Sequence, residues 1–274
     1  MTLFKVSVIS ESGQTFEFPL QDMSAGYYVA DIQGLDPVKA ALAMSKFGSA
    51  DGAQYQGSRR ESRNVVIDLG YNPDYVTNSV ASLRAALYAA MIPKAEVKLR
   101  FHHTEGLVVG ATGRVESFES PLFVRTPKST ISILCGDPDF YDINETSVPL
   151  NTVSGTTEAE IVYQGDVWSG FRIEVAVNRS IAGLDFTHRG PDNVINPISL
   201  VYSLIAGDQV VISTVPGNKG AWLTRASETS SILYGIDPSS SWPRFRNGIN
   251  YVRLQVAGAA IPYAIKYTTK YGGL

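Results

Sequence analysis

The sequence has almost no cysteine, little charge and no long hydrophobic run. Cys135 is the only cysteine, so no disulfide can form within the chain and no zinc site can be built from several thiolates. Charged residues make up 18% of the 274 residues, the formal net charge is −3, and Lys and Arg form no block. This balance argues against nucleic-acid binding by phosphate neutralisation.

Targeting segments are missing from the pattern as well. No stretch approaches the roughly 18 apolar residues of a membrane-spanning helix. The first ten residues alternate apolar and polar side chains, unlike the unbroken apolar run of a secretory signal. We therefore expect no membrane insertion and folding in the cytoplasm.

Residues that could carry chemistry are scarce. His102 and His103 are neighbours on a predicted strand and face opposite sides, so they cannot share one metal ion, and we expect His188 to lie in a solvated turn. No nucleophile elbow, phosphate-binding glycine loop or paired-histidine zinc motif is present. The strand-like run that ends at Cys135 predicts a buried thiol. We expect no enzyme, no catalytic or metal-binding residue and no cofactor.

Strand and turn residues are abundant, with 24 Gly, 14 Pro and 14 Tyr in a chain that is 44% hydrophobic. Period-two alternation predicts strands in the first half at 3–9, 14–18, 62–69, 96–102, 107–118 and 128–135. In the second half it predicts strands at 159–163, 171–177, 181–186, 209–214, 221–225, 250–256 and 263–268.

One helix is expected, over residues 73–91. Asn72 would cap its start, and the residue before Pro93 would end it. Its apolar stripe consists of Val76, Val80, Leu83 and Leu87. We therefore predict a mainly β chain with two domains: residues 1–140 form a β domain with one helix, and residues 141–274 form an antiparallel β-sandwich.

The segment from Gly34 to Arg60 fits neither pattern. Its apolar residues predict a short helix near 38–47, and the small polar residues at 48–57 predict a mobile loop. A connection this long inside a compact domain is usually functional or disordered. We interpret it as a contact with another subunit or with a tube, and an ordinary surface loop is the alternative. The candidate contact residues are Leu35, Val38, Leu42, Met44, Phe47, Asp51 and Tyr55.

Three ordered stretches resemble a known family. The first contains Gly34–Pro37, Asp51-Gly52 and Arg63–Leu69; the second contains Leu83–Leu87, Ile92-Pro93, Val97–Phe101, Gly113–Glu116 and Leu134–Tyr141; the third contains Ser241–Phe245, Gly248–Asn250 and Tyr271–Leu274. In this order they resemble the distal tail proteins of long-tailed, non-contractile bacteriophages.

The resemblance implies a β-barrel-like first domain with one helix and a galectin-like sandwich, with the last residues packing back on the first domain. It implies a structural protein of the virion tail tip that assembles as a homohexameric ring and lets DNA pass without specific binding. The implied partners are the tail tube protein, the tail hub or tail-associated protein and a receptor-binding protein.

A galectin-like sandwich also raises a sugar-binding alternative, in which a baseplate module recognises host glycans. Neither sugar motif of galectins is present, because Arg189-Gly190 follow His188, and Leu223-Thr224 follow Trp222. Trp168, Trp222 and Trp242 could form a stacking platform, although buried anchors of the sandwich are the simpler interpretation. A β-sandwich hydrolase with paired carboxylates is a third, more distant alternative.

Overall fold

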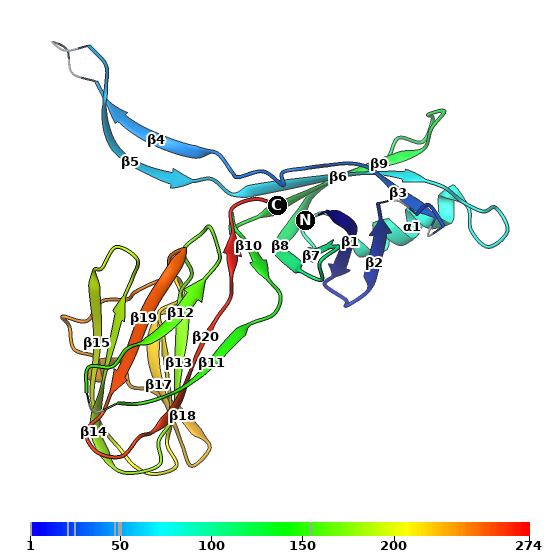
Figure 1. Cartoon of the computed structure of the whole chain (residues 1–274). Coiled ribbons are helices and arrows are strands. Elements are labelled where there is room, and N and C mark those ends of the chain that lie inside the picture. The colour runs from blue at the N-terminus through cyan, green and yellow to red at the C-terminus, as the bar shows by residue number, and fades with distance from the viewer. Residues whose placement is uncertain (1, 21, 25, 47, 49–50, 154) are drawn as a thin grey trace. The chain divides into compact units, whose positions relative to one another are not determined.

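The computed structural model describes residues 2–20, 22–24, 26–46, 48, 51–153 and 155–274, and the chain divides into two compact units (Figure 1). Unit 1 comprises Met1–Ile143 together with Tyr271–Leu274, and unit 2 comprises Asn144–Lys270. The prediction of a mainly β chain with one helix, a barrel-like first part and an antiparallel sandwich is confirmed.

Unit 1 is built on one curled sheet with the strand order β2-β1-β7-β8-β9-β6-β3. Its elements are β1 (Leu3–Ser10), β2 (Thr15–Pro19), β3 (Tyr27–Gln33), β4 (Ala40–Ser45), β5 (Gln54–Arg60), β6 (Arg63–Tyr71), α1 (Val80–Ala90), β7 (Glu96–His103), β8 (Val108–Glu119), β9 (Lys128–Cys135), β10 (Phe140–Asp142) and β21 (Lys270–Tyr271). Side chains that alternate inward, such as Val65, Ile67 and Leu69 of β6, fill the interior.

Helix α1 covers this core but is shorter than expected. It begins after Ser79, whose hydroxyl accepts the backbone N–H of Ser82 in a capping box, and not after Asn72. Leu83, Leu87 and Ala90 are buried on its inner face. Val76 precedes the helix and is 90% exposed, so the predicted start and the first residue of the predicted stripe are wrong.

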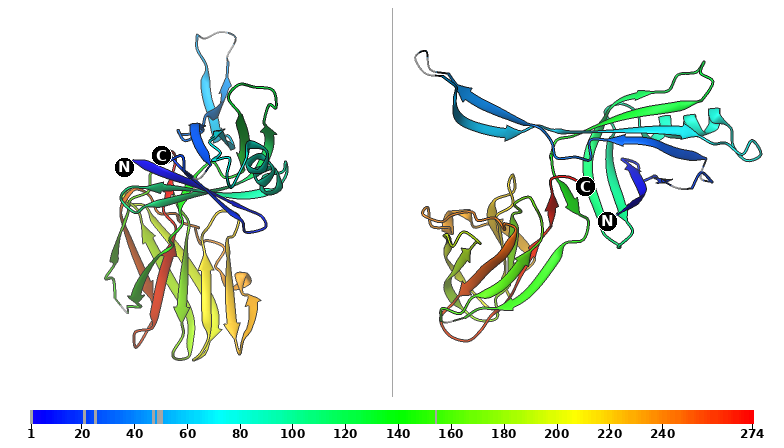
Figure 2. Two further views of the ribbon diagram at one scale, coloured as in Figure 1. Left: turned by 90° about the vertical axis from the view of Figure 1, so that its right-hand side faces the viewer. Right: turned by 45° about the horizontal axis from the view of Figure 1, so that its top comes forward.

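Strands β4 and β5 form a hairpin of their own, which runs out beyond the rest of the first sheet in Figures 1 and 2. Their register runs from Ala40 opposite Arg60 to Ser45 opposite Gln54, with a bulge between Ala43 and Met44. The expected short helix near 38–47 is therefore wrong. Neither strand buries a face, so the usual period-two pattern of strands is missing here.

Unit 2 is a sandwich of two antiparallel sheets, with the orders β11-β20-β13-β16-β17-β18 and β12-β19-β14-β15. Its elements are β11 (Thr146–Asn151), β12 (Ala159–Tyr163), β13 (Phe171–Ala176), β14 (Ile181–Arg189), β15 (Ile195–Leu204), β16 (Gln209–Ser213), β17 (Gly220–Arg225), β18 (Glu228–Ser231), the short 3-10 helix η1 (Leu233–Gly235), β19 (Gly248–Gln255) and β20 (Pro262–Tyr267).

The centre of the sandwich is aromatic, with Phe171 and Phe245 stacked 4.4 Å apart between ring centroids. His188 lies in this core and is 2% exposed, so the expected solvated turn is wrong. Its Nε2 donates a hydrogen bond of 3.1 Å to Asn250 Oδ1, and burial lowers the pKa of the imidazole. The inward alternation of Leu184 and Phe186 simply continues to this histidine.

Candidate assembly interface

The β4–β5 hairpin presents large apolar side chains to solvent. Leu42 is 61% exposed, Met44 is 51% exposed and Tyr55 is 56% exposed. Met44 and Tyr55 face each other in the register of the hairpin. Solvent-facing side chains of this size on two neighbouring strands mark a surface suited to a protein contact.

The base of the hairpin is held by a buried arginine. Arg63, the first residue of β6, is 1% exposed and donates hydrogen bonds only to backbone carbonyls among the described residues. The acceptors and distances are Pro138 (2.8 Å), Gly34 (2.5 Å), Asp36 (2.8 Å) and Gly272 (2.5 Å). Its guanidinium carbon lies 4.0 Å from the centroid of the Phe140 ring.

An ion pair reinforces the same place. Arg60, the last residue of β5, binds the carboxylate of Asp139 through both terminal nitrogens, and Asp139 is 5% exposed.

Burial lowers the pKa of Arg63. Carbonyl dipoles, the face of Phe140 and the nearby Asp139 compensate its charge. Four parts of the chain that carried the family resemblance, near Gly34, Arg63, Pro138 and Gly272, thus meet around one side chain.

The predicted contact residues do not all lie on the hairpin surface. Leu35 is partly buried and packs against the core of unit 1, and Val38 is half-buried in the connection to β4. Asp51 is exposed in the turn between the strands. Phe47 lies outside the described residues. Only Leu42, Met44 and Tyr55 are therefore brought together as an exposed apolar group.

A second exposed apolar group was not predicted from the sequence. The loop between β8 and β9 carries Leu122, Phe123 and Val124, and Phe123 is 99% exposed. The loop is tied to α1, because Arg84 Nε donates a hydrogen bond of 2.9 Å to Ser120 Oγ. The signal was available as three consecutive apolar residues in a turn region, where polar residues are usual.

The three tryptophans have different surroundings in unit 2. Trp168 is 44% exposed and stacks with the guanidinium groups of Arg244 and Arg246, at 4.9 and 4.1 Å. Trp222 lies on β17 between the buried Ala221 and Leu223. Trp242 is partly buried and packs against the sandwich core. No ring contact joins any two of them in the part of the chain that the structure describes.

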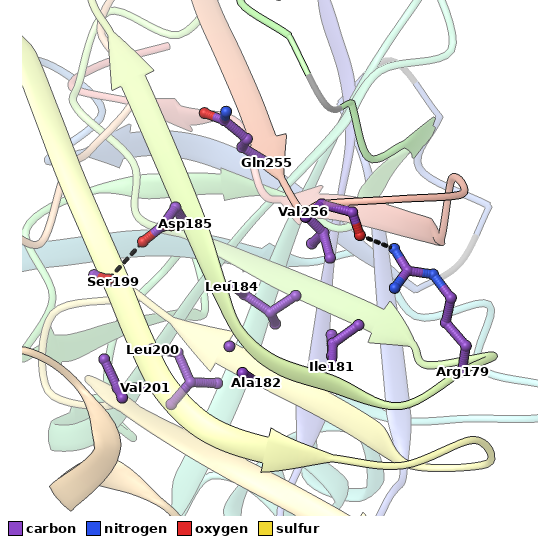
Figure 3. Close-up of a pocket in the computed structure, with 12 residues that line it drawn as sticks. Arg179, Ile181, Ala182, Leu184, Asp185, Ser199, Leu200, Val201, Gln255 and Val256 are labelled. Carbon is purple, nitrogen blue, oxygen red and sulfur yellow. Dashed lines mark hydrogen bonds between the residues drawn. The ribbon is translucent and has the colours of Figure 1, made fainter.

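A groove of about 660 Å³ runs beside β14, β15 and β19 in unit 2 (Figure 3). Its polar groups are already engaged: Ser199 donates a hydrogen bond of 2.5 Å to Asp185, and Arg179 donates to the carbonyls of Ala257 and Ala259. Its floor is aliphatic, with Leu184 and Leu200, and its lining contains no aromatic ring. The groove therefore has no aromatic platform on which a sugar ring could stack.

Among the described residues, no group of three or more His, Cys, Asp or Glu side chains is placed to hold a metal ion. Within the same residues, no helix combines the length and the apolar character needed to cross a bilayer.

No protein-family profile and no curated protein sequence matches the chain. Solved structures do match it in fold. The Dit protein of phage SPP1, described as a paradigm of the hub adsorption apparatus in phages that infect Gram-positive bacteria, has a TM-score of 0.70 and 15% identity, over 97% of this chain and 98% of that one.

The baseplate of phage P2 in its activated conformation also matches. A chain of the form with Ca has a TM-score of 0.53 and 10% identity over 100% of both chains, and one of the form with Sr has 0.51 and 10% over 99% of both. The resemblance drawn from the sequence is thereby confirmed at the level of the fold. Over nearly its whole length, the chain has the fold of phage Dit and baseplate proteins.

Proposed function

We propose that this chain is a structural hub protein of a phage tail tip, located in the virion, whose unit 1 assembles into a closed ring of six copies. The observation that carries the proposal is the fold match to SPP1 Dit across both units. In this assignment the ring joins the tail tube to the tail hub, and unit 2 is the platform for a receptor-binding protein. The protein has no enzymatic task in this role.

The β4–β5 hairpin is the contact that would join the copies. Each strand of a two-stranded ribbon has one edge whose backbone groups can pair with another chain. If β4 of one copy meets β5 of the next, the contact is head-to-tail, and repetition at about 60° per copy closes a ring of six. The side chains of Leu42, Met44 and Tyr55 project from the ribbon and are exposed in the single chain, so a neighbouring copy would cover them only by packing over the face of the ribbon as well.

The loop with Leu122, Phe123 and Val124 would then contact the neighbouring tail protein along the axis. Its attachment to α1 fixes the apolar side chains before binding, which lowers the entropy cost of association. DNA would pass through the ring without being held, because the chain has a formal charge of −3. Few phosphates would be neutralised by Lys or Arg, so little counterion release would favour DNA binding.

A double variant of the hairpin and a control in unit 2 test the lateral contact. Leu42→Asp combined with Met44→Asp places charges on the exposed face of β4, so the six-copy particle should be lost while unit 1 stays folded. Val162→Asp is the matched control, because Val162 is a 54% exposed valine on β12 of unit 2. Native mass spectrometry counts the copies. An intact six-copy particle in the hairpin variant would contradict this contact.

A further inference from the structure

We propose that Arg63 and the segment Tyr271–Leu274 form a clamp that fixes the direction in which the β4–β5 hairpin leaves unit 1. In the sequence, the hairpin is inserted between β3 and β6, which are neighbouring strands of the sheet. The β3–β6 ladder ends where Gln33 faces Val66, and the hairpin ladder starts where Ala40 faces Arg60. The residues between these two ladders form a joint.

Hydrogen bonds from the Arg63 side chain, together with a backbone bond of 3.1 Å from the Glu61 N–H to the carbonyl of Lys39, hold this joint in place of a strand ladder. Arg63 Nη1 donates hydrogen bonds to the carbonyls of Gly34 and Asp36, which lie in the connection between β3 and β4. Gly34 has a φ of +86°, and a Cβ there would lie 1.9 Å from the carbonyl oxygen of Asn64. The segments around Gly34 and Asn64 are therefore in direct backbone contact at the joint. A planar guanidinium can serve several carbonyls at fixed angles, which a lysine ammonium cannot do.

The segment Tyr271–Leu274 closes the joint from the other side. Gly272 accepts a hydrogen bond of 2.5 Å from Arg63 Nη2, and Leu274 N–H donates one of 3.0 Å to the carbonyl of Leu35. Gly273 lies so close to Pro37 that a Cβ would be 2.8 Å from the proline Cδ. In Figure 1 this end of the chain lies beside the base of the hairpin.

The clamp matters because a two-stranded ribbon has little stability of its own, so its direction depends on what holds its base. It also lies where the chain enters and leaves unit 2. Pro138 precedes the entry at Asn144, and Tyr271 follows the exit at Lys270. A fixed direction of the hairpin would set how neighbouring copies meet; this consequence for assembly rests on the proposed function.

The test measures the hairpin in the dilute, single chain. Spin labels at Gln54→Cys on β5 and Lys98→Cys on β7 report the distance between the hairpin and the sheet, and buried Cys135 does not compete for the label. The clamp variants are Arg63→Lys, which keeps the charge, and Gly273→Val, which forces the last segment away from Pro37. The controls are Arg59→Lys and Gly57→Val, which lie on the hairpin outside the clamp; a Cβ at Gly57 meets nothing within 4 Å.

We expect a narrow distance distribution in the unaltered chain and both controls, and a broad one in both clamp variants. The Leu274 and Glu61 amides should exchange about tenfold faster in the clamp variants. Distributions equally narrow in all five chains would overturn the clamp, whether or not a ring forms. If the clamp variants behave as expected but the chain never assembles, the clamp is supported and the proposed ring is contradicted.

Discussion

Phe18 on β2 and Tyr27 on β3 meet edge to face with their ring centroids 5.6 Å apart, although these strands stand at opposite ends of the strand order. The two edges of the sheet thus approach through side chains without sharing a ladder. Tyr27 also donates a hydrogen bond of 2.9 Å to the carbonyl of Leu83 in α1. The helix therefore fixes the place where the curled sheet comes closest to closing.

The docking of α1 on this core is directly testable. Leu87 is fully buried, and Leu87→Ala should lower the free energy of unfolding of unit 1 by about 2–5 kcal/mol through lost burial and a cavity. Val76→Ala, at a 90% exposed position, should change it by less than about 0.5 kcal/mol. Labelling of Cys135 against denaturant concentration measures both. Equal midpoints for the two variants would show that the helix is not docked.

Cys135 provides a second prediction. Burial raises the pKa of its thiol to about 11 from an ordinary 9.0, so the folded chain should resist alkylation at pH 8. Because the unfolded thiol ionises more readily, its contribution to stability is complete below pH 9 and declines as the pH rises toward 11. Cys135→Ala should remove this part of the alkaline decline. Rapid alkylation of the native chain would contradict the buried position.

We expect His188 to make the stability of unit 2 sensitive to acid. Its folded-state pKa is lowered by burial, whereas the unfolded imidazole titrates near 6.5. The folded state is therefore favoured above pH 6.5, and stability is lost as the pH falls from there toward the lowered value. All three tryptophans belong to unit 2, so tryptophan fluorescence in urea follows this unit alone. If the urea midpoint of His188→Gln falls with acid as steeply as that of the unaltered chain, His188 is not the cause of the acid sensitivity.

Most strands could be predicted because they bury one face, which leaves a period-two pattern such as Val65, Ile67 and Leu69. The predicted helix start after Asn72 is wrong because the residues that follow form a turn around the side chain of Asp74. Its Oδ1 accepts the N–H groups of Val76, Thr77 and Asn78 at 2.9–3.0 Å, and the hydroxyl of Thr77 donates to its Oδ2. The bond from the Thr77 hydroxyl, followed by these backbone bonds, lowers the pKa of Asp74 to about 2. Tyr75, with φ of 59°, prevents the helix from starting there.

The candidate interface was predictable only in part. Leu42, Met44 and Tyr55 stand out in the sequence as apolar residues in an otherwise small and polar segment, but a ribbon with both faces in solvent gives no strand pattern. The clamp was not visible at all. Arg63 lies 209 residues from Gly272, and a buried arginine bound to carbonyls has no sequence signal that distinguishes it from a surface arginine.

The central claim is the ring of six, and the mass of the particle in solution tests it most directly. Light scattering over a range of concentrations separates a six-copy particle of about 178 kDa from the 29.7 kDa single chain, and mass action makes the particle dissociate on dilution. We expect the larger mass at high concentration or in the presence of tail-tube or hub proteins. A mass of 29.7 kDa under all of these conditions would contradict the account.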